Sequence, residues 1–379
     1  MSLVCVSCSL KLEPDLWLFR CPVCGGMLEV RLPENIEIRW NSLRGRGVWR
    51  YWELLPIRRE VKPVTLGEGG TPLLKAERAG GPEVYVKFEG ANPTGSFKDR
   101  GMTVGITIAK SLRVGAVAVA STGNTAASAA AYAARAGLRC LVYLPKRGVA
   151  KGKLAQALLH GAEVVEIEGS FDQALEEVLD RVISKEAEIY PLNSVNPWRL
   201  EGQKTLAFEV VEELGRTPNA VIVPVGNAGN ISAIWKGFKE LLEVGVIEKT
   251  PRMIGVQAEG AAPLAKAWLR KEPKLIPVEE PETVASAIRI GKPVNWFKAW
   301  RALEESRGTM IVVSDDEILK AQKLLARLEG IGVEPASAAA LAGYLKSLNE
   351  GLIDRDETVV IVATGHALKD PDSIFRNVD

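Results

Sequence analysis

Hydrophobic runs and amphipathic stretches alternate along most of the chain, from Val84 to its end. The hydrophobic runs predict strands near residues 84–88, 116–120, 138–144, 163–168, 220–225, 253–257, 310–313 and 358–362. The amphipathic stretches between them predict helices, among them residues 125–136, 171–185, 231–242, 315–328 and 337–348. This alternation is typical of βαβ units in a largely parallel sheet. Because the runs lack a strict polar alternation, we expect both faces of each sheet to be buried.

The number and spacing of these strands indicate an α/β fold with two doubly wound α/β domains, for which a parallel barrel is the alternative. We expect a large α/β domain from residues 35–97 and 190–379 and a small α/β domain from residues 98–189. Residues 1–34 are expected to form a separate small segment. Residues 39–63 are a poorly periodic connector whose fold the pattern does not predict.

The charge balance gives no reason to expect a nucleic acid or an anionic membrane as the main partner. The 379 residues include 48 basic and 47 acidic side chains, for a net charge of +1. The longest uncharged stretch, residues 114–134, is interrupted by polar residues and fits strand, loop and helix better than a membrane span. The first residues lack the pattern of a signal peptide, so a cytoplasmic location and a small-molecule partner are expected.

Four of the five cysteines form two Cys-x-x-Cys pairs near the N-terminus, Cys5 with Cys8 and Cys21 with Cys24. Two such pairs supply four thiolates in the arrangement of a zinc ribbon, although the loop between them is a little shorter than usual. Structural disulfides are an alternative that a reducing cytosol disfavours, and a redox-active pair would not need a second copy. Since four thiolates leave no open position, the predicted metal is structural.

Polar loops follow three of the predicted strands, at the edge where open α/β sheets bind their ligands. They are residues 121–125, 226–230 and 363–366. The second loop, Gly-Asn-Ala-Gly-Asn, matches neither the dinucleotide fingerprint nor the Walker phosphate loop. Its backbone N–H groups can still bind one phosphate at a helix start, and an ordinary turn with an N-cap is the alternative.

A fourth polar segment, residues 92–101, places a lysine at the start of a predicted helix. Its Asn-Pro and Thr-Gly steps mark a turn, and Ser96 is the expected N-cap, so Phe97 and Lys98 would enter the first helical turn. The helix macrodipole disfavours a positive charge there and favours the neutral amine that a Schiff base requires. For this segment taken alone, a solvated surface lysine is the alternative.

Together these motifs resemble the fold-type II family of pyridoxal-phosphate enzymes and, within it, the threonine synthase family. The resemblance runs from the cysteine pairs to the last strand. Its motifs are GSFKDRG at 95–101, STGNT at 121–125, NSVNPWRLEGQKT at 193–205, GNAGN at 226–230, AIRIGKPVNW at 287–296 and ATGHALKDPD at 363–372. One departure is Ala367, where the family more often has glycine.

The resemblance implies pyridoxal 5'-phosphate as the cofactor, bonded covalently to Lys98. It implies that Phe97 lies near the cofactor ring, that Asn124 hydrogen-bonds its phenolic oxygen and that Thr364 faces its pyridine nitrogen. The residues implied to bind the cofactor phosphate are Gly226, Asn227, Ala228, Gly229 and Asn230.

The resemblance also implies two sets of substrate-binding residues. The substrate carboxylate would be bound by Ser121, Thr122 and Thr125. A second, substrate-borne phosphate would be bound by Asn193, Ser194 and Arg199. The planar fork of an arginine suits such a dianion, although an arginine on a helix surface is the alternative for this position.

The activity implied by the resemblance is a lyase that converts O-phospho-L-homoserine and water to L-threonine and phosphate, by γ-elimination and then β-hydration. A hydroxyl at Thr364 leaves the cofactor ring a weaker electron sink than a carboxylate would, which favours elimination over transamination. A homodimer is expected.

Three other functions stay open at this point. A threonine or serine dehydratase would need no phosphate site, and a cysteate or cysteine synthase acting on phosphoserine would use a shorter substrate. From another class, the cysteine pairs could belong to a nucleic-acid-binding or regulatory protein whose enzyme domains have lost their activity. Neutral overall charge and the intact Lys98 argue against this last reading.

Overall fold

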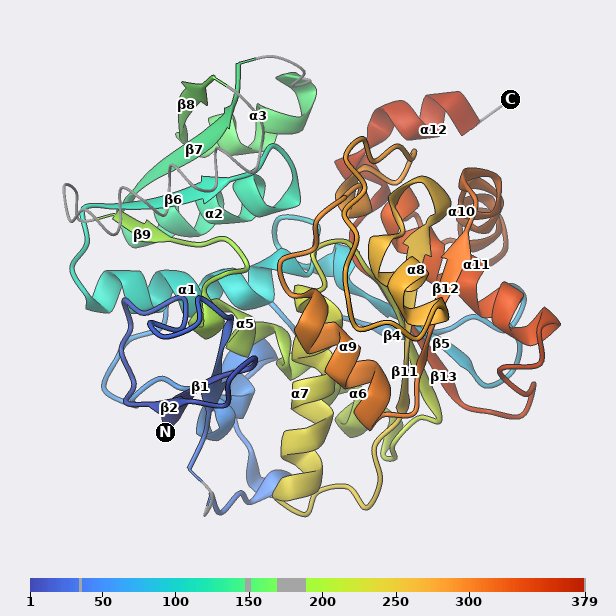
Figure 1. The fold of residues 1–379 in the computed structure, drawn as a ribbon, viewed down its shortest axis with the longest axis horizontal. Coiled ribbons are helices and arrows are strands. Elements are labelled where there is room, and N and C mark those ends of the chain that lie inside the picture. Colours follow the sequence, from blue (N-terminus) through green and yellow to red (C-terminus); the bar gives the residue numbers. More distant parts are fainter. Residues whose placement is uncertain (34–35, 147–150, 169–188, 378–379) are drawn as a thin grey trace. The chain divides into compact units, whose positions relative to one another are not determined.

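The computed structural model describes residues 1–33, 36–146, 151–168 and 189–377 (Figure 1). The chain divides into two compact units. Unit 1 comprises Met1–Gly69 and Asn92–Gln203, and unit 2 comprises Gly70–Ala91 and Lys204–Asp379. This division differs from the expected domain boundaries, since residues 35–69, 92–97 and 190–203, expected in the large domain, belong to unit 1.

Unit 1 contains a four-stranded parallel sheet with the strand order β8-β7-β6-β9. Its strands are β6 (Ala116–Ala120), β7 (Arg139–Pro145), β8 (Glu163–Ile167) and β9 (Ile189–Pro191). Its helices are α1 (Lys98–Ser111), α2 (Asn124–Ala136), α3 (Lys151–Leu159) and α5 (Pro197–Gln203). The alanine-rich α2 is buried along most of its length and ends where Gly137 adopts a φ of 73°, a conformation that favours glycine.

The N-terminal residues of unit 1 form a three-stranded antiparallel sheet with the order β2-β1-β3. Its strands are β1 (Ser2–Cys5), β2 (Lys11–Leu12) and β3 (Leu28–Arg31), and two short 3-10 helices follow, η1 (Trp40–Ser42) and η2 (Gly47–Leu54). Leu3, Leu28 and Val30 are fully buried in the same hydrophobic core as Met102 and Tyr190. The N-terminal segment therefore shares the core of unit 1.

Unit 2 contains a six-stranded sheet with the order β12-β11-β10-β13-β5-β4, parallel except for the edge strand β4. Its strands are β4 (Leu73–Lys75), β5 (Val84–Phe88), β10 (Ala220–Pro224), β11 (Arg252–Ala258), β12 (Thr309–Val313) and β13 (Val359–Ala363). Its helices are α6 (Thr205–Leu214), α7 (Gly229–Glu243), α8 (Pro263–Leu269), α9 (Trp296–Glu305), α10 (Asp315–Glu329), α11 (Pro335–Asn349) and α12 (Pro371–Asn377). Short 3-10 helices lie at η3 (Glu89–Ala91), η4 (Glu259–Ala261), η5 (Ser286–Ile288) and η6 (Ala367–Lys369).

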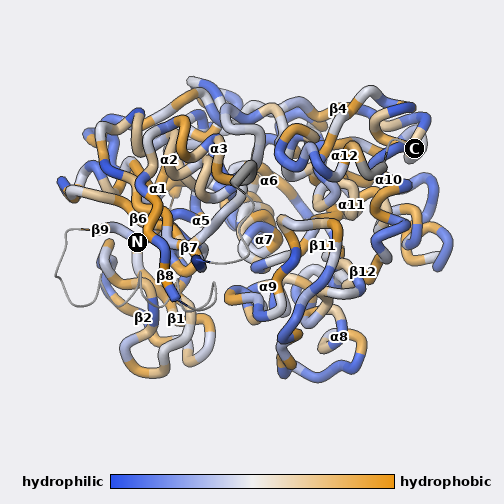
Figure 2. The backbone as a smooth tube through the Cα atoms, turned by 90° about the horizontal axis from the view of Figure 1, so that it is seen from above, coloured by the Kyte–Doolittle hydropathy of each residue, from blue (hydrophilic) through white to orange (hydrophobic). Residues whose placement is uncertain are grey.

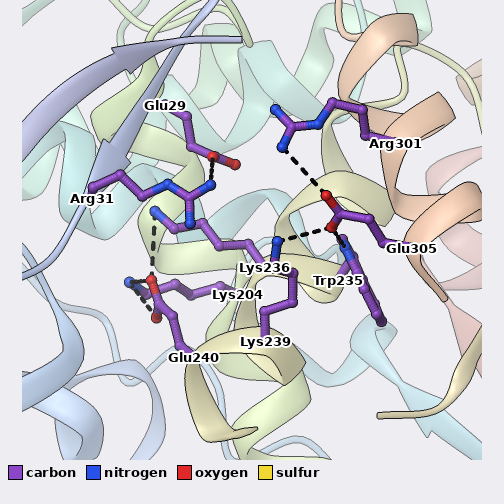
Figure 3. Close-up of polar contacts among 9 residues, drawn as sticks. All are labelled: Glu29, Arg31, Lys204, Trp235, Lys236, Lys239, Glu240, Arg301 and Glu305. Atoms are coloured by element: carbon purple, nitrogen blue, oxygen red, sulfur yellow. Dashed lines mark hydrogen bonds and ion pairs between the residues drawn. The ribbon is translucent and has the colours of Figure 1, made fainter. Parts of the chain in front are cut away.

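Two polar clusters hold helix α7 in place within unit 2 (Figure 3). The buried Lys204 Nζ lies 2.8 Å from Glu240 Oε2. On another face of the same helix, Glu305 of α9 accepts hydrogen bonds from Trp235 Nε1 and Lys239 Nζ, each at 2.8 Å. Because charged groups buried without partners are costly, these pairs favour one position of α7. These pairs therefore also fix the position of the loop that leads into α7.

All eight predicted strands are confirmed, within two residues at each end. The strands not predicted are β4, β9 and those of the N-terminal sheet, which span only two to four residues each. Of the named helices, 171–185 lies outside the described residues, and the others are confirmed. The barrel alternative is wrong because both large sheets are open.

The helices and strands could be predicted from hydropathy, since hydrophobic and hydrophilic residues alternate along the helices of both units (Figure 2). The interior strands β10 and β13 are buried at every position, as expected for strands covered on both faces. No helix of the described residues is long and apolar enough to cross a membrane.

Candidate functional site

Lys98 is the first residue of α1, so it lies at the positive end of that helix. The N-cap is Phe97, whose side chain makes no capping hydrogen bond. The prediction that Ser96 is the N-cap is therefore wrong, and its buried Oγ has no hydrogen-bond partner among the described residues. Lys98 is half-buried, and its Nζ lies 4.4 Å from the centroid of the Phe97 ring.

The carboxylate of Asp99 fixes the turn that precedes Lys98. It is fully buried and accepts hydrogen bonds from Thr94 N and Thr94 Oγ1, both at 2.7 Å, and from Ser128 Oγ of α2 at 2.5 Å. Burial raises the pKa of Asp99 to about 6 despite these hydrogen bonds. One side chain thus ties the turn, α1 and α2 together beside the lysine.

We expect the contribution of Asp99 to the free energy of unfolding to decrease as the pH rises from about 4 to about 6. Since the pKa of Asp99 is about 6 in the folded protein against an ordinary value of 3.8, the folded state binds the extra proton in that window. The stabilising contribution of this carboxyl is therefore greatest below about pH 4 and decreases as the pH rises, by on the order of 2–3 kcal/mol in total. Urea unfolding of the wild type and of Asp99→Asn across this range measures the effect.

Asp99→Asn should lack this component, and Asp356→Asn, which changes an exposed carboxyl, is the control. Parallel stability curves for the wild type and Asp99→Asn would contradict the prediction.

The polar loop at 121–125 lies at the carboxyl end of β6 and leads into α2. Its residues are half-buried, and Ser121 Oγ accepts a hydrogen bond from Gly123 N at 3.2 Å. The Asn193 side chain joins the next polar segment to this edge, since its Oδ1 accepts from Ala120 N and its Nδ2 donates to Ala120 O, both at 2.9 Å. Residues 121–125, which include those expected to bind the substrate carboxylate, and residues 193–194, expected to bind its phosphate, therefore follow adjacent parallel strands.

Arg199 lies on α5 and is only 1% exposed. Its Nε and Nη2 atoms have no hydrogen-bond partner among the described residues, and burial lowers the pKa of its guanidinium to about 10. The helix packs closely against α1, because a Cβ on Gly202 would lie 1.8 Å from Arg100 O. A buried guanidinium with unused donors is costly unless an anion pairs with it.

Asn196 is a residue of this region that sequence reasoning missed. Its Oδ1 accepts hydrogen bonds from Trp198 N at 3.0 Å and Arg199 N at 3.2 Å, as an N-cap does, and its Nδ2 donates to Pro191 O at 2.8 Å. The Asn-Pro step at 196–197 is the signal that could have identified it, since asparagine is favoured at the N-cap and proline at the first helical position.

In unit 2 the glycine loop of residues 226–230 joins β10 to α7. Ala228 is the N-cap of α7 and has a φ of 61°, which is strained for a residue other than glycine. Both polar atoms of the nearly buried Asn230 amide, Oδ1 and Nδ2, have no partner among the described residues. A helix start with strained backbone and an unpaired amide fits a bound anion.

The segment at 287–296 packs against this loop. Asn227 Oδ1 accepts a hydrogen bond from Val294 N at 2.6 Å, and Asn227 O accepts one from Asn295 N at 3.2 Å. A Cβ on Gly226 would lie 3.1 Å from the Cα of Ile288, so a side chain there would press on the segment. These contacts fix the conformation of the loop.

Thr364 follows β13 and is buried. Its Oγ1 lies 2.9 Å from Ser337 Oγ of α11, which also accepts a hydrogen bond from Gly365 N at 2.7 Å. Ser337 was not identified from the sequence, where nothing in its surroundings distinguishes it from the other small residues of its helix. It orients the hydroxyl of Thr364.

The four N-terminal cysteines form a cluster whose sulfur atoms all lie within 4.8 Å of one another. Cys5 Sγ is 3.4 Å from Cys24 Sγ, and Cys8 Sγ is 3.7 Å from Cys21 Sγ. Zinc–sulfur bonds of about 2.3 Å in a tetrahedron place the sulfurs about 3.8 Å apart, so the geometry fits a four-thiolate site. The cysteines form no disulfide.

Comparison with known proteins identifies the family. A family model described as pyridoxal-phosphate dependent enzyme matches residues 64–365. The threonine synthase of Methanocaldococcus jannaschii is 54% identical over 98% of this chain and 94% of the relative. The threonine synthase of Mycobacterium tuberculosis is 50% identical over 86% of this chain and 89% of the relative.

Solved structures agree with this fold. The threonine synthase structure from Escherichia coli has a TM-score of 0.77 at 19% identity and covers 100% of this chain and 92% of that one. The threonine deaminase structure from Solanum lycopersicum has a TM-score of 0.66 at 23% identity and covers 81% of this chain and 86% of that one. With the sequence relatives, these matches show that the chain belongs to the threonine synthase family of pyridoxal-phosphate dependent enzymes.

Proposed function

We propose that this chain converts O-phospho-L-homoserine and water to L-threonine and inorganic phosphate with pyridoxal 5'-phosphate as cofactor. The observation that carries the proposal is the identity of 54% to a threonine synthase across nearly the whole chain. The buried guanidinium of Arg199, whose Nε and Nη2 atoms have no partner in the described part of the chain, supports a phosphorylated substrate in particular, because a substrate without a phosphate would leave that charge unmatched.

The residues proposed to hold the cofactor fit its chemistry. Lys98, at the start of α1, supplies the amine for the covalent bond, and Phe97 is its neighbour in sequence. Asn124 is the first residue of α2, which is joined to α1 by the hydrogen bond from Ser128 to Asp99. The loop 226–230 offers to the cofactor phosphate its backbone N–H groups and the Asn230 amide, which has no partner within the described ranges. Thr364, oriented by Ser337, offers a hydroxyl to the pyridine nitrogen. When bound, the cofactor is the electron sink for negative charge at the substrate's α-carbon.

The substrate is proposed to be held at both of its anionic ends. Ser121, Thr122 and Thr125 bind its carboxylate with hydroxyl and backbone donors at the start of α2. Ser194 and Arg199 bind its phosphate. Asn193 contributes mainly by position, since its amide already pairs with the backbone of Ala120.

Lys98 is proposed to move the protons of the reaction. Its amine takes the proton from the substrate's Cα as general base and returns protons at later stages. Arg199 orients the Cγ–O bond and neutralises charge on the departing phosphate. A water molecule then adds at Cβ. The hydroxyl of Thr364 does not keep the pyridine nitrogen protonated as a carboxylate would, which favours elimination over transamination.

A phosphate-release assay tests this proposal. The purified protein should show the visible absorption of bound pyridoxal phosphate and release phosphate from phosphohomoserine with equal amounts of threonine. A cysteate or cysteine synthase would release phosphate from phosphoserine instead, and a dehydratase would form ammonia from threonine or serine. Either result, or a protein that stays colourless after addition of the cofactor, would contradict the proposal.

Further parts of the proposal concern the protein as a whole. The cysteine cluster is proposed to hold one structural zinc ion, because the spacing of its sulfur atoms fits four thiolates. A cytoplasmic location and a homodimeric state are also proposed. Metal analysis of the purified protein and sedimentation measurements test the first and last of these.

A further inference from the structure

The loop between the two cysteine pairs, residues 9–20, contacts the elements that carry the proposed phosphate residues. Tyr190 of β9 donates a hydrogen bond from its hydroxyl to Leu16 O at 3.1 Å. Trp198 of α5 donates one from Nε1 to Asp15 O at 3.3 Å. Both acceptors are backbone carbonyls, so the contacts depend on the path of the loop itself.

Aromatic rings reinforce the same contact. Trp17 and Phe19 of the loop meet the ring of Tyr190 edge to face, with centroid distances of 5.4 Å and 5.6 Å. The rings of Tyr190 and Trp198 are fully buried. The contacts of Trp17 and Phe19 with the buried Tyr190 ring stabilise the loop against β9.

The contacted side chains lie next to the residues proposed to bind the substrate phosphate. Trp198 immediately precedes Arg199, and Tyr190 lies in the strand that leads to Asn193. Asn196 links the two elements, because it caps α5 and donates to Pro191 O at the end of β9. A shift of the loop would therefore move the backbone that supports the buried guanidinium.

The cysteines determine where this loop begins and ends. Cys8 precedes it and Cys21 follows it, and their sulfur atoms lie 3.7 Å apart. A metal ion shared by both pairs would fix the two ends of the loop, because it would bond to cysteines on either side of it.

We propose that a metal ion in the cysteine cluster positions Arg199 for the substrate phosphate, acting through the loop at 9–20, Tyr190 and Trp198. The cluster thus contributes to binding of the substrate phosphate and does not affect cofactor binding. This inference rests on the proposed function, which supplies the phosphorylated substrate.

The first test removes the metal from the holoenzyme with a chelator and restores it with zinc. Metal content is measured by mass spectrometry, and cofactor content by visible absorption. We expect the KM for phosphohomoserine and the inhibition constant of inorganic phosphate to rise together, about tenfold, while kcat and bound cofactor stay within about twofold. Zinc should restore both constants.

The second test breaks the contacts without touching the cysteines, in case the metal-free protein unfolds. Tyr190→Phe and Trp198→Phe each remove one hydrogen bond to the loop and keep a buried ring, so we expect each to raise the same two constants about three- to tenfold. Tyr344→Phe is the matched control, because the Tyr344 hydroxyl also donates to a backbone carbonyl, that of Gly80 at 2.9 Å, in unit 2. It should leave both constants unchanged.

The outcomes separate this inference from the proposed function. A wild type that does not release phosphate from phosphohomoserine would defeat the proposed function itself. An active wild type that binds no metal, keeps its KM after metal removal, or keeps its KM in both aromatic variants would overturn the inference. Loss of cofactor in step with the metal would also overturn it, because the cluster would then act on the whole fold.

Discussion

Replacing Lys98 with alanine is expected to reduce phosphate release from phosphohomoserine by about 10³-fold or more. The proposed function gives this amine two roles, the covalent bond to the cofactor and the transfer of the Cα proton, and each one alone contributes several orders of magnitude in comparable enzymes. Lys98 is the first residue of α1, and both roles require the amine of a lysine. Steady-state phosphate release and the visible spectrum measure the effect.

Lys110→Ala is the matched control for this experiment. Lys110 lies on the same helix, at its last turn, and is exposed, so its removal should change neither the rate nor the spectrum. We also expect Lys98→Ala to keep some cofactor without a covalent bond, since the proposed contacts of loop 226–230 remain. A Lys98→Ala protein with wild-type turnover would end the proposal that this residue is the catalytic base.

The strands and the glycine loop could be predicted because their signals are local. A buried parallel strand such as 220–224 is a continuous hydrophobic run, and a turn into a helix requires small or polar residues. The same holds for Lys98, whose place at a helix start follows from the turn residues before it. The sequence predicts the N-cap one residue early, because a serine such as Ser96 is a favoured capping residue. In the structure Phe97 is the N-cap, and the preceding turn is held by the Asp99 carboxylate, which accepts hydrogen bonds from Thr94.

Other features depend on contacts between distant residues and leave no local signal. Asn193 was assigned to phosphate binding from its motif, yet its amide pairs with Ala120, a residue more than seventy positions away in the chain. Ser337 reaches Thr364 across 27 positions. The sharing of one core by the N-terminal sheet and α1 likewise depends on tertiary packing. Such pairings follow from strand order, which hydropathy alone does not determine.

Arg199→Met is expected to raise the KM for phosphohomoserine by about 100-fold and, at the same time, to stabilise the protein in the absence of phosphate. Loss of a buried charge-assisted contact to a dianion costs on the order of 2–5 kcal/mol of binding. Without the anion, however, the buried Nε and Nη2 atoms have no partner among the residues that the structure describes, so an apolar side chain of similar length removes a desolvation penalty. Initial rates at varied substrate and urea unfolding with and without phosphate measure the two effects.

The opposite signs of these effects distinguish a binding residue from a structural one. Phosphate should stabilise the wild type against urea and have little effect on Arg199→Met. Arg135→Met, which changes an exposed arginine on α2, should leave both the KM and the phosphate effect unchanged. If Arg199→Met instead destabilises the protein and keeps its KM, the guanidinium serves the fold of α5 and the substrate phosphate is bound elsewhere. The expected pattern would mean that the protein keeps an energetically costly buried charge because substrate binding requires it.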